Sequence, residues 1–440
     1  MAGRYKAYPE YKDSGAEWLG DLPKHWEAKR LGQFFLERRE KVSDKDYSAL
    51  SVTMRGIVPQ LDTAAKTDAG DNRKLVLKND FVINSRSDRK GSSGVSPYDG
   101  SVSLISIVLE PRNIEPLYVH HLLRSYPFQE EFYRFGKGIV ADLWSTNSSE
   151  MKNIQIPSIP LPEQKQIAKF LDHETGKIDL LIEKQQALIA LLKEKRQAVI
   201  SHAVTKGLNP NAKMKDSGVE WLGQVPEHWK VVSFAQCVLI TGGLVDPRVE
   251  PFKGYTMIAP NHIESRSGRL LKLETAAEQG AESGKYLCQQ EEVIYSKIRP
   301  ALAKACLCPK DNVLCSADMY PMRGVLGLSN SYLFRLVLTD EFTAFTIMES
   351  DRVAMPKMNR ESLGSTRLPI PPEAEQSDIV RHIDIECSKI DQLVGHAELA
   401  AQLLQERRTA LISAAVTGKI DVRDWEPAPE AEESLKGETV

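Results

Sequence analysis

Two long stretches of the chain place apolar residues at the three- and four-residue spacing of an amphipathic helix. A proline followed by an acidic residue lies at the start of each stretch, and a glycine ends it, as is typical of helix boundaries. The pattern predicts one helix over residues 161–208 and a second over residues 371–418. The apolar positions of the first helix are Ile167, Leu171, Ile178, Leu181, Ile182, Leu188, Ile189, Leu192 and Val199.

Each predicted helix is long enough to need a partner along its apolar face. Residues 163–205 and 375–417, about 43 in each helix, make a rod of roughly 65 Å at a rise of about 1.5 Å per residue. Ala397, Ala400 and Ala401 would let the second helix approach closely where Leu188 and Ile189 project from the first. This pattern favours an antiparallel coiled coil formed within the chain. The alternative is that each helix packs only on the globular part beside it.

Shorter β-type runs precede each helix, in residues 27–156 and 230–368. They include LVLKNDFVIN, SVSLISIVLE and EEVIYSKIRP, and turns rich in Gly, Asp and Ser separate them. Helical patterns occupy residues 116–134 and 330–349, which are matching places in the two halves. Both segments are therefore predicted to be mixed α/β domains.

The chain contains an internal repeat, which establishes the order of its parts. KDSGAEWLGDLPKHW at residues 12–26 returns as KDSGVEWLGQVPEHW at residues 215–229, with 11 of 15 positions identical at an offset of 203. We call these two segments knuckles. A second set of repeated residues lies in the helices at an offset of 212, where Glu163-Gln164 and Lys177-Ile178-Asp179 recur as Glu375-Gln376 and Lys389-Ile390-Asp391.

The repeat predicts an α+β protein with two mixed α/β domains in a pseudo-twofold arrangement, joined by two long helices that form an antiparallel coiled coil. The variable segments between knuckle and helix share little sequence, so one scaffold carries two different surfaces. The expected parts are a first domain at 1–160 with its knuckle, a helix at 161–208, a second domain at 209–370 with its knuckle, a helix at 371–418 and an acidic, disordered tail at 419–440.

The acidic charge of the chain is concentrated near its C-terminus. Residues 1–370 carry +5 and residues 371–440 carry −8, which sum to the net charge of −3. Within the second range, residues 421–440 hold seven acids and two bases and are expected to be solvated. The net charge therefore does not exclude a nucleic-acid partner.

Cysteine usage and hydropathy bear on the compartment of the protein. No apolar run approaches the roughly 18 residues of a membrane span, and no secretion segment opens the chain, so we expect a cytoplasmic protein without a membrane partner. We expect the six cysteines, all in the second half, to be reduced and not to form a disulfide framework. Cys306, Cys308 and Cys315 lack the second CxxC of a zinc site and are predicted to be buried in strands.

No catalytic constellation emerges from the residues. Gly280 to Tyr286 has the wrong spacing and final residue for a phosphate loop, and no GxSxG motif is present. Asn209-Pro210-Asn211 only weakly resembles a methyltransferase motif, and we interpret these three residues as a helix stop. His25, His228 and His120-His121 are expected to have core or surface roles. The chain is therefore predicted to bind no metal or cofactor and to be no enzyme on its own.

Loops rich in arginine, lysine and short polar side chains indicate recognition. In the first domain such a loop follows a β run, and its side chains suit phosphates and base edges, although a merely solvated loop is the alternative. Its candidate DNA-binding residues are Arg86, Ser87, Arg89, Lys90 and Ser92. A later cluster adds Lys137, Asn147 and Lys152, of which the two lysines are expected to contact phosphates.

The second domain has candidates in equivalent places. Arginine can donate two hydrogen bonds to guanine, asparagine can pair with adenine, and lysine binds phosphates, so the mixture suits sequence reading. The candidates are Lys297, Arg299 and Lys304 after a β run, and Arg352, Lys357, Asn359 and Arg360 before the second helix.

With these parts in order, the chain resembles the specificity subunits of type I restriction–modification systems over nearly its whole length. The WLGxxPxHW knuckle, the LPEQxxI helix start and the closing AVT of each helix are specific in combination. DFVINSR and EVIYSKIRPALAKA resemble strand and loop segments of that family's target recognition domains. One departure is minor: Pro162 has no proline counterpart at Ala374.

The resemblance implies a sequence-specific DNA-binding subunit whose two domains each read one half of an interrupted target, with the paired helices acting as a ruler. It implies double-stranded DNA, two modification subunits and restriction subunits as partners. Those partners would use S-adenosylmethionine, ATP and Mg²⁺, so this chain needs no cofactor. One alternative is a related system with a fused methyltransferase–nuclease partner, and another is a helical spacer that binds no DNA.

Overall fold

The computed structural model describes residues 5–60, 70–138, 144–350 and 356–427. The chain divides into two compact units. Unit 1 comprises residues 1–185 and 399–440, and unit 2 comprises residues 186–398. Each unit thus contains one globular part and one portion of each long helix.

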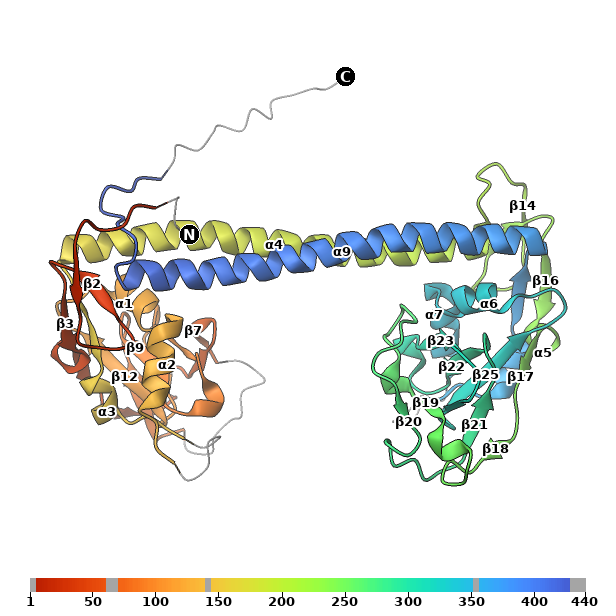
Figure 1. Ribbon diagram of the computed structural model, residues 1–440, viewed down its shortest axis with the longest axis horizontal. Coiled ribbons are helices and arrows are strands. Elements are labelled where there is room, and N and C mark those ends of the chain that lie inside the picture. The colour runs from red at the N-terminus through yellow and green to blue at the C-terminus, as the bar shows by residue number, and fades with distance from the viewer. Residues whose placement is uncertain (1–4, 61–69, 139–143, 351–355, 428–440) are drawn as a thin grey trace, which may run out of the picture. The chain divides into compact units, whose positions relative to one another are not determined.

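The globular part of unit 1 is built on two antiparallel sheets (Figure 1). The four-stranded sheet has the order β10-β9-β12-β4, with β4 (Phe35–Glu37), β9 (Phe81–Asn84), β10 (Ser93–Val95) and β12 (Ser106–Pro111). The second sheet has the order β11-β8-β5, with β5 (Lys41–Val42), β8 (Arg73–Val76) and β11 (Gly100–Val102). The knuckle strands are β1 (Tyr11–Asp13) and β2 (Asp21–Pro23), and the other pairs are β3 (Glu27–Arg30) with β13 (Gln155–Ser158) and β6 (Leu50–Thr53) with β7 (Gly56–Pro59).

Unit 2 repeats this plan. Its four-stranded sheet β23-β22-β25-β17 has the same order as that of unit 1, with β17 (Val238–Ile240), β22 (Val293–Ser296), β23 (Ala305–Leu307) and β25 (Met319–Gly324). Its second sheet, β18-β21-β24-β19-β20, contains β18 (Leu244–Val245), β19 (Thr256–Ile258), β20 (Glu274–Thr275), β21 (Lys285–Cys288) and β24 (Val313–Cys315). The remaining pairs are β14 (Met214–Asp216) with β15 (Gln224–Pro226) and β16 (Lys230–Ser233) with β26 (Arg367–Ile370).

Short helices accompany the sheets, and two predicted helical stretches are each divided in two. Residues 116–134 form α1 (Pro116–Leu122) and α2 (Tyr126–Arg134), because Pro127 lies in the first turn of a new helix. Residues 330–349 form α6 (Asn330–Val337) and α7 (Asp340–Met348), since the Thr339 side chain caps α7 by accepting from Phe342 N. The other short helices are α3 (Ser148–Asn153), α5 (Phe234–Cys237) and α8 (Arg360–Ser365).

The two long helices, α4 (Leu161–Lys206) and α9 (Glu373–Val416), pack antiparallel within each unit (Figure 1). In unit 1, Ile167 and Leu171 from the start of α4 share a buried core with Leu411 and Ala415 from the end of α9. In unit 2, the end of α4 and the start of α9 share the other large core through Ile200, Val204, Ile379 and Ile383. The predicted α+β class with two long, paired helices is confirmed.

One expected detail of the helix pairing is wrong for Leu188, whereas Ile189, Ala400 and Ala401 are at least partly buried as expected. Ala397 is buried, as predicted, but Leu188 is exposed. The buried positions of α4 in unit 2 are instead Leu192, Gln197, Ile200 and their neighbours toward the end of the helix. Leu188 lies just before this stretch, and apolar spacing alone does not reveal which leucines of a long stripe a partner covers.

The expected acidic tail begins later than residue 419. Ile420 and Val422 are buried in the core of unit 1, and the ring of Trp425 lies 5.2 Å from that of Phe170. Asp421 N donates to Lys6 O at 2.7 Å, so the segment after α9 pairs with the segment before the first knuckle. Apolar residues within an acidic stretch therefore hold residues 419–427 in place, and residues 428–440 lie outside the described part of the chain.

Candidate nucleic-acid interface

In unit 1 the structure brings together the two clusters of candidate residues. The loop that leaves β9 and the segment that enters α3 meet through a backbone bridge between Arg86 and Ser145. Ser87 N donates to Trp144 O at 2.9 Å, and Thr146 N donates to Ser85 O at 3.0 Å. Segments that lie about sixty residues apart in the chain therefore form one surface.

Unit 2 joins its two clusters in the same way. Ile298 and Lys357 form the equivalent bridge, each 212 residues after its counterpart in unit 1. Arg299 N donates to Pro356 O at 2.9 Å, and Met358 N donates to Lys297 O at 2.7 Å. The same backbone frame thus presents different side chains in the two units.

The basic side chains of the first surface differ in how they are engaged. Arg86 is exposed, and its guanidinium makes no hydrogen bond or ion pair with any described residue. Arg89 approaches only Asp88, at 3.7 Å, whereas Lys90 forms an ion pair with Glu130. Lys137 pairs with Glu150 at 2.7 Å and remains largely exposed. Arg86 is therefore the arginine of this surface most open to a ligand.

Three candidates of the first surface have structural roles. Asn147 caps α3, because its Oδ1 accepts from Glu150 N at 2.9 Å. Ser92 is buried, and its backbone pairs with Asn84 and Arg89. Lys152 Nζ lies 3.3 Å from Glu37 Oε2. Burial acts to raise the pKa of Glu37, but hydrogen bonds from Arg39, Ser148 and Lys152 outweigh burial and lower that pKa below its usual value. A DNA contact by any of these three residues stays a prediction.

The second surface centres on cations gathered around one aromatic ring. Lys297 Nζ lies 5.1 Å and the Arg360 guanidinium 5.4 Å from the ring centre of Tyr320. Burial lowers the pKa of Lys297, and the charges of Lys357 and Arg360 lower it further, while Asp318 opposes them. Lys357 is exposed and pairs with no described acid. An anion placed here would relieve the mutual repulsion of the cations.

The remaining candidates of unit 2 have varied surroundings. Arg299 is exposed and has a left-handed backbone, with φ of 49°. Lys304 Nζ donates to Pro260 O at 2.6 Å. Asn359 caps α8 by accepting from Ser362 N at 2.7 Å, as Asn147 caps α3. Arg352 lies outside the described residues.

The repeated Glu-Gln pair connects each knuckle to its long helix, a role that the sequence analysis did not assign. Glu163 accepts from Tyr8 Oη at 2.6 Å and Trp26 Nε1 at 3.1 Å, and it pairs with His25 at 3.0 Å. Burial and the Glu163 carboxylate raise the pKa of Tyr8. The recurrence of Glu163 together with His25 was the available signal.

The equivalent connection in unit 2 is less complete. Glu375 pairs with His228 at 2.8 Å, while Trp229 Nε1 is buried and has no hydrogen-bond partner among the described residues. The glutamines behave alike in both units: Gln164 accepts from Glu115 N at 2.7 Å and Gln376 accepts from Ser329 N at 2.9 Å. The repeated residues thus orient the helix start against the globular part.

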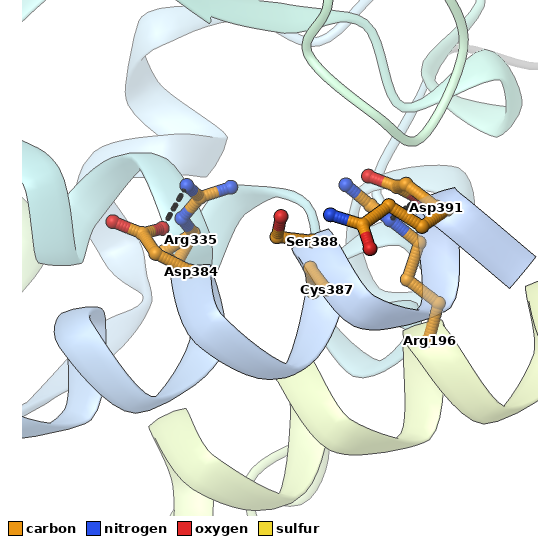
Figure 2. A pocket seen from close by; sticks show the side chains of 7 residues that line it. Arg196, Arg335, Asp384, Cys387, Ser388 and Asp391 are labelled. Carbon is orange, nitrogen blue, oxygen red and sulfur yellow. Dashed lines mark hydrogen bonds and ion pairs between the residues drawn. The ribbon is translucent and has the colours of Figure 1, made fainter.

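A polar hollow of about 400 Å³ lies where α6 packs on the helix pair of unit 2 (Figure 2). Arg335 of α6 pairs with Asp384, and Arg196 of α4 pairs with Asp391 at 3.0 Å. Figure 2 shows Ser388 and Cys387 between the two pairs. Both arginines already have carboxylate partners, and these two ion pairs link α4 and α6 to α9.

No group of three metal-ligating side chains occurs within residues 5–60, 70–138, 144–350 and 356–427. The six cysteines are all buried and free, and four of them, Cys288, Cys306, Cys308 and Cys315, lie in one apolar core. Burial raises the pKa of the Cys308 thiol to about 12, as expected for an inert core cysteine. Among the helices of the described ranges, none is long and apolar enough to span a membrane.

Comparison with known proteins connects this architecture to restriction–modification systems. Residues 23–190 match the family described as the type I restriction modification DNA specificity domain. The type I restriction enzyme EcoDI specificity subunit of Escherichia coli is 26% identical over 401 residues, covering 86% of this chain and 83% of the relative. The type I restriction enzyme MjaVIII specificity subunit of Methanocaldococcus jannaschii is 27% identical over 53% of this chain and 54% of its own.

Solved structures share the fold. A chain from a structural study of complex assembly and conformational transition of the type I restriction–modification system aligns over 91% of this chain and 99% of its own, with a TM-score of 0.68 at 15% identity. The HsdS subunit from Thermoanaerobacter tengcongensis aligns over 91% and 98%, with a TM-score of 0.50 at 16% identity. These matches confirm the resemblance to specificity subunits of type I restriction–modification systems.

Proposed function

We propose that this chain is a non-catalytic DNA-recognition subunit of a type I restriction–modification complex, in which each unit reads one half of an interrupted target. The observation that carries the proposal is the repeated backbone bridge, Arg86 with Ser145 and Ile298 with Lys357. One frame occurs twice, and each copy displays its own side chains at the same positions.

Differences at matched positions give the two surfaces different hydrogen-bonding chemistry. Arg86 of unit 1 is replaced by Ile298, and Ser87 by Arg299. An arginine can donate two hydrogen bonds to a guanine, which the residue at the matched position in the other unit cannot do. The two units are therefore expected to read different half-sites, so that the whole target is asymmetric.

The chemistry of modification and cleavage falls to partner subunits in this proposal. Two modification subunits would supply S-adenosylmethionine-dependent methylation of adenine, and restriction subunits would supply ATP-driven, Mg²⁺-dependent cleavage, in the cytoplasm. The relatives named above are specificity subunits of restriction enzymes, which supports this division of labour. A partner with fused methyltransferase and nuclease would use the same recognition surfaces.

The proposal is tested by assembling the chain with its modification subunits and measuring methyl transfer and DNA binding. The complex should methylate one interrupted sequence and prefer it over a scrambled duplex, while the chain alone should transfer no methyl groups. Robust methyl transfer by the isolated chain, with contaminating methyltransferase excluded, would contradict the non-catalytic role. Equal binding of target and scrambled duplexes by the complex would contradict sequence recognition.

A further inference from the structure

A hollow of about 640 Å³ opens beside the recognition loop of unit 1. Ser87 and Lys90 of that loop form part of its wall, and Trp144 forms another part. The hydrogen bond from Ser87 N to Trp144 O joins these parts, so the wall of the hollow is continuous with the candidate DNA surface. A group that leaves the bound duplex at this surface would meet the hollow directly.

The lining of the hollow suits a flat, neutral group. Trp18, Tyr133 and Trp144 supply three aromatic rings, and the Trp144 side chain is 40% exposed. The charged residues of the wall are largely paired with one another, Lys90 with Glu130 and Arg134 with Glu131. Because these acids offset the cations, the hollow does not attract a phosphate, whereas aromatic rings stack with any nucleobase.

Unit 2 fills the equivalent space differently. Phe128 of α2 packs edge-on to Trp18 at 5.9 Å, and Phe342 of α7 packs edge-on to Trp221 at 5.8 Å, so the two helices correspond. Three residues further along α7, Phe345 adds a second ring 6.0 Å from Trp221. The corresponding residue of unit 1 is Glu131.

The position that matches Trp144 also differs between the units. Ser145 and Lys357 occupy matched positions in the two backbone bridges, so the residues before them, Trp144 and Pro356, also correspond. Unit 1 therefore lacks a ring equivalent to Phe345 beside Trp18, the counterpart of Trp221, and has an exposed indole, Trp144, at the wall. Both differences favour a planar guest in unit 1.

We propose that this hollow takes one nucleobase, unstacked from the half-site bound by unit 1, with Trp144 stacking on it. The proposal rests on the DNA-recognition function above and deepens it. A base that has left the duplex loses its stacking and pairing, and an aromatic pocket beside the groove compensates part of that loss. Unit 1 would then select its half-site partly through the ease of unstacking one base.

The test uses 2-aminopurine, whose fluorescence rises when it leaves the base stack. The full chain is assembled with its modification subunits and bound to its target duplex, with the probe placed in turn at every half-site position except the adenines that are methylated. The expected result is an increase at one position of the half-site read by unit 1. Trp144→Ala should abolish that increase and weaken binding to this half-site about tenfold.

Two further variants keep the test informative if Trp144→Ala is poorly folded. Glu131→Phe introduces the ring that unit 2 carries at this position and should block entry of the base, with the same loss of fluorescence. Tyr126→Ala removes an aromatic side chain of α2 that is 58% exposed and does not line the hollow, so it should leave the signal unchanged. Binding to the other half-site should be the same in all three variants.

Selective binding with every probe of the first half-site still quenched would overturn the inference and leave the proposed function intact. A fluorescent position that persists in both Trp144→Ala and Glu131→Phe would overturn it as well. Equal binding of target and scrambled duplexes would instead overturn the proposed function and the inference together.

Discussion

Arg408 and Asp179, 229 residues apart in the chain, form an ion pair in which Nε lies 2.8 Å from Oδ1. A shift of 212 residues relates Asp179 to Asp391 and Arg196 to Arg408, so the pair between Arg196 and Asp391 is its internal copy. The antiparallel helix pair therefore has the same register in both units. The internal sequence repeat accounts for the occurrence of one pairing geometry in both units.

This register predicts a measurable coupling between Arg408 and Asp179. The arginine side chain is 28% exposed and the aspartate 52% exposed, so solvent screens the pair and its coupling free energy should be about 0.5 kcal/mol. A double-mutant cycle with Arg408→Ala and Asp179→Ala, read by urea unfolding of the full chain, measures it. The same cycle at Arg196 and Asp391 is the matched control. Strictly additive effects in both cycles would contradict the ion pairs.

The caps of α3 and α8 separate a structural role from a DNA contact. Asn147→Ala and Asn359→Ala should each lower the free energy of unfolding by about 1 kcal/mol, because each removes a side-chain acceptor at a helix start. Asn147→Ser and Asn359→Ser retain an acceptor and should restore most of that stability. If the serine variants are stable yet change the preferred half-site, these asparagines also read bases, as the sequence analysis predicted.

Lys357 is expected to contact a phosphate and not a base. It is exposed beside Lys297 and Arg360, where an anion would be stabilised. Lys357→Ala should weaken binding of the assembled complex to target and scrambled duplexes alike, and should reduce the slope of log K against log salt by about 1. Lys389→Ala, on the long helix and paired with Glu386, is a suitable control. A loss confined to one target sequence would instead make Lys357 a base contact.

Periodicity and repetition made the helices and the overall class predictable, because both depend on local spacing. The breaks at Pro127 and Thr339 were missed although each has a local cause, a first-turn proline and a capping threonine. The packing of Ile420 and Val422 was missed because a tertiary core decides it. The candidate loops were found from composition. Their composition did not separate Arg86 from Lys90, because Glu130, which engages Lys90, lies 40 residues away. Long-range pairing of this kind is visible only in the folded chain.

The helices act as a ruler only if their length sets the distance between the two half-sites. The two ion pairs define a register in which Ala190 of α4 lies opposite Ala397 of α9. Inserting four residues at both positions adds about 6 Å and is close to one helical turn, so the apolar seam stays nearly in phase. At about 3.4 Å per base pair, the non-specific spacer of the target should lengthen by one or two base pairs.

The readout for this insertion is the set of methylated adenines in cells that carry the lengthened chain and its partner subunits. Both half-sites should keep their sequences while the interval between them grows. An unchanged interval in an active enzyme would contradict the ruler. Altered half-sites would mean that the helices, and not only the loops, influence base reading.

The central claim is that each unit reads its own half-site, and genome-wide mapping of methylated adenines in cells with Arg86→Gln or Arg299→Gln tests it most directly. Glutamine is chosen because it removes the charge without adding the strain of a branched residue at the left-handed Arg299. The account predicts an interrupted two-part motif, with each variant relaxing one part by about 1 to 3 kcal/mol and leaving the other unchanged. A continuous motif, or a change in both parts from either single variant, would contradict it.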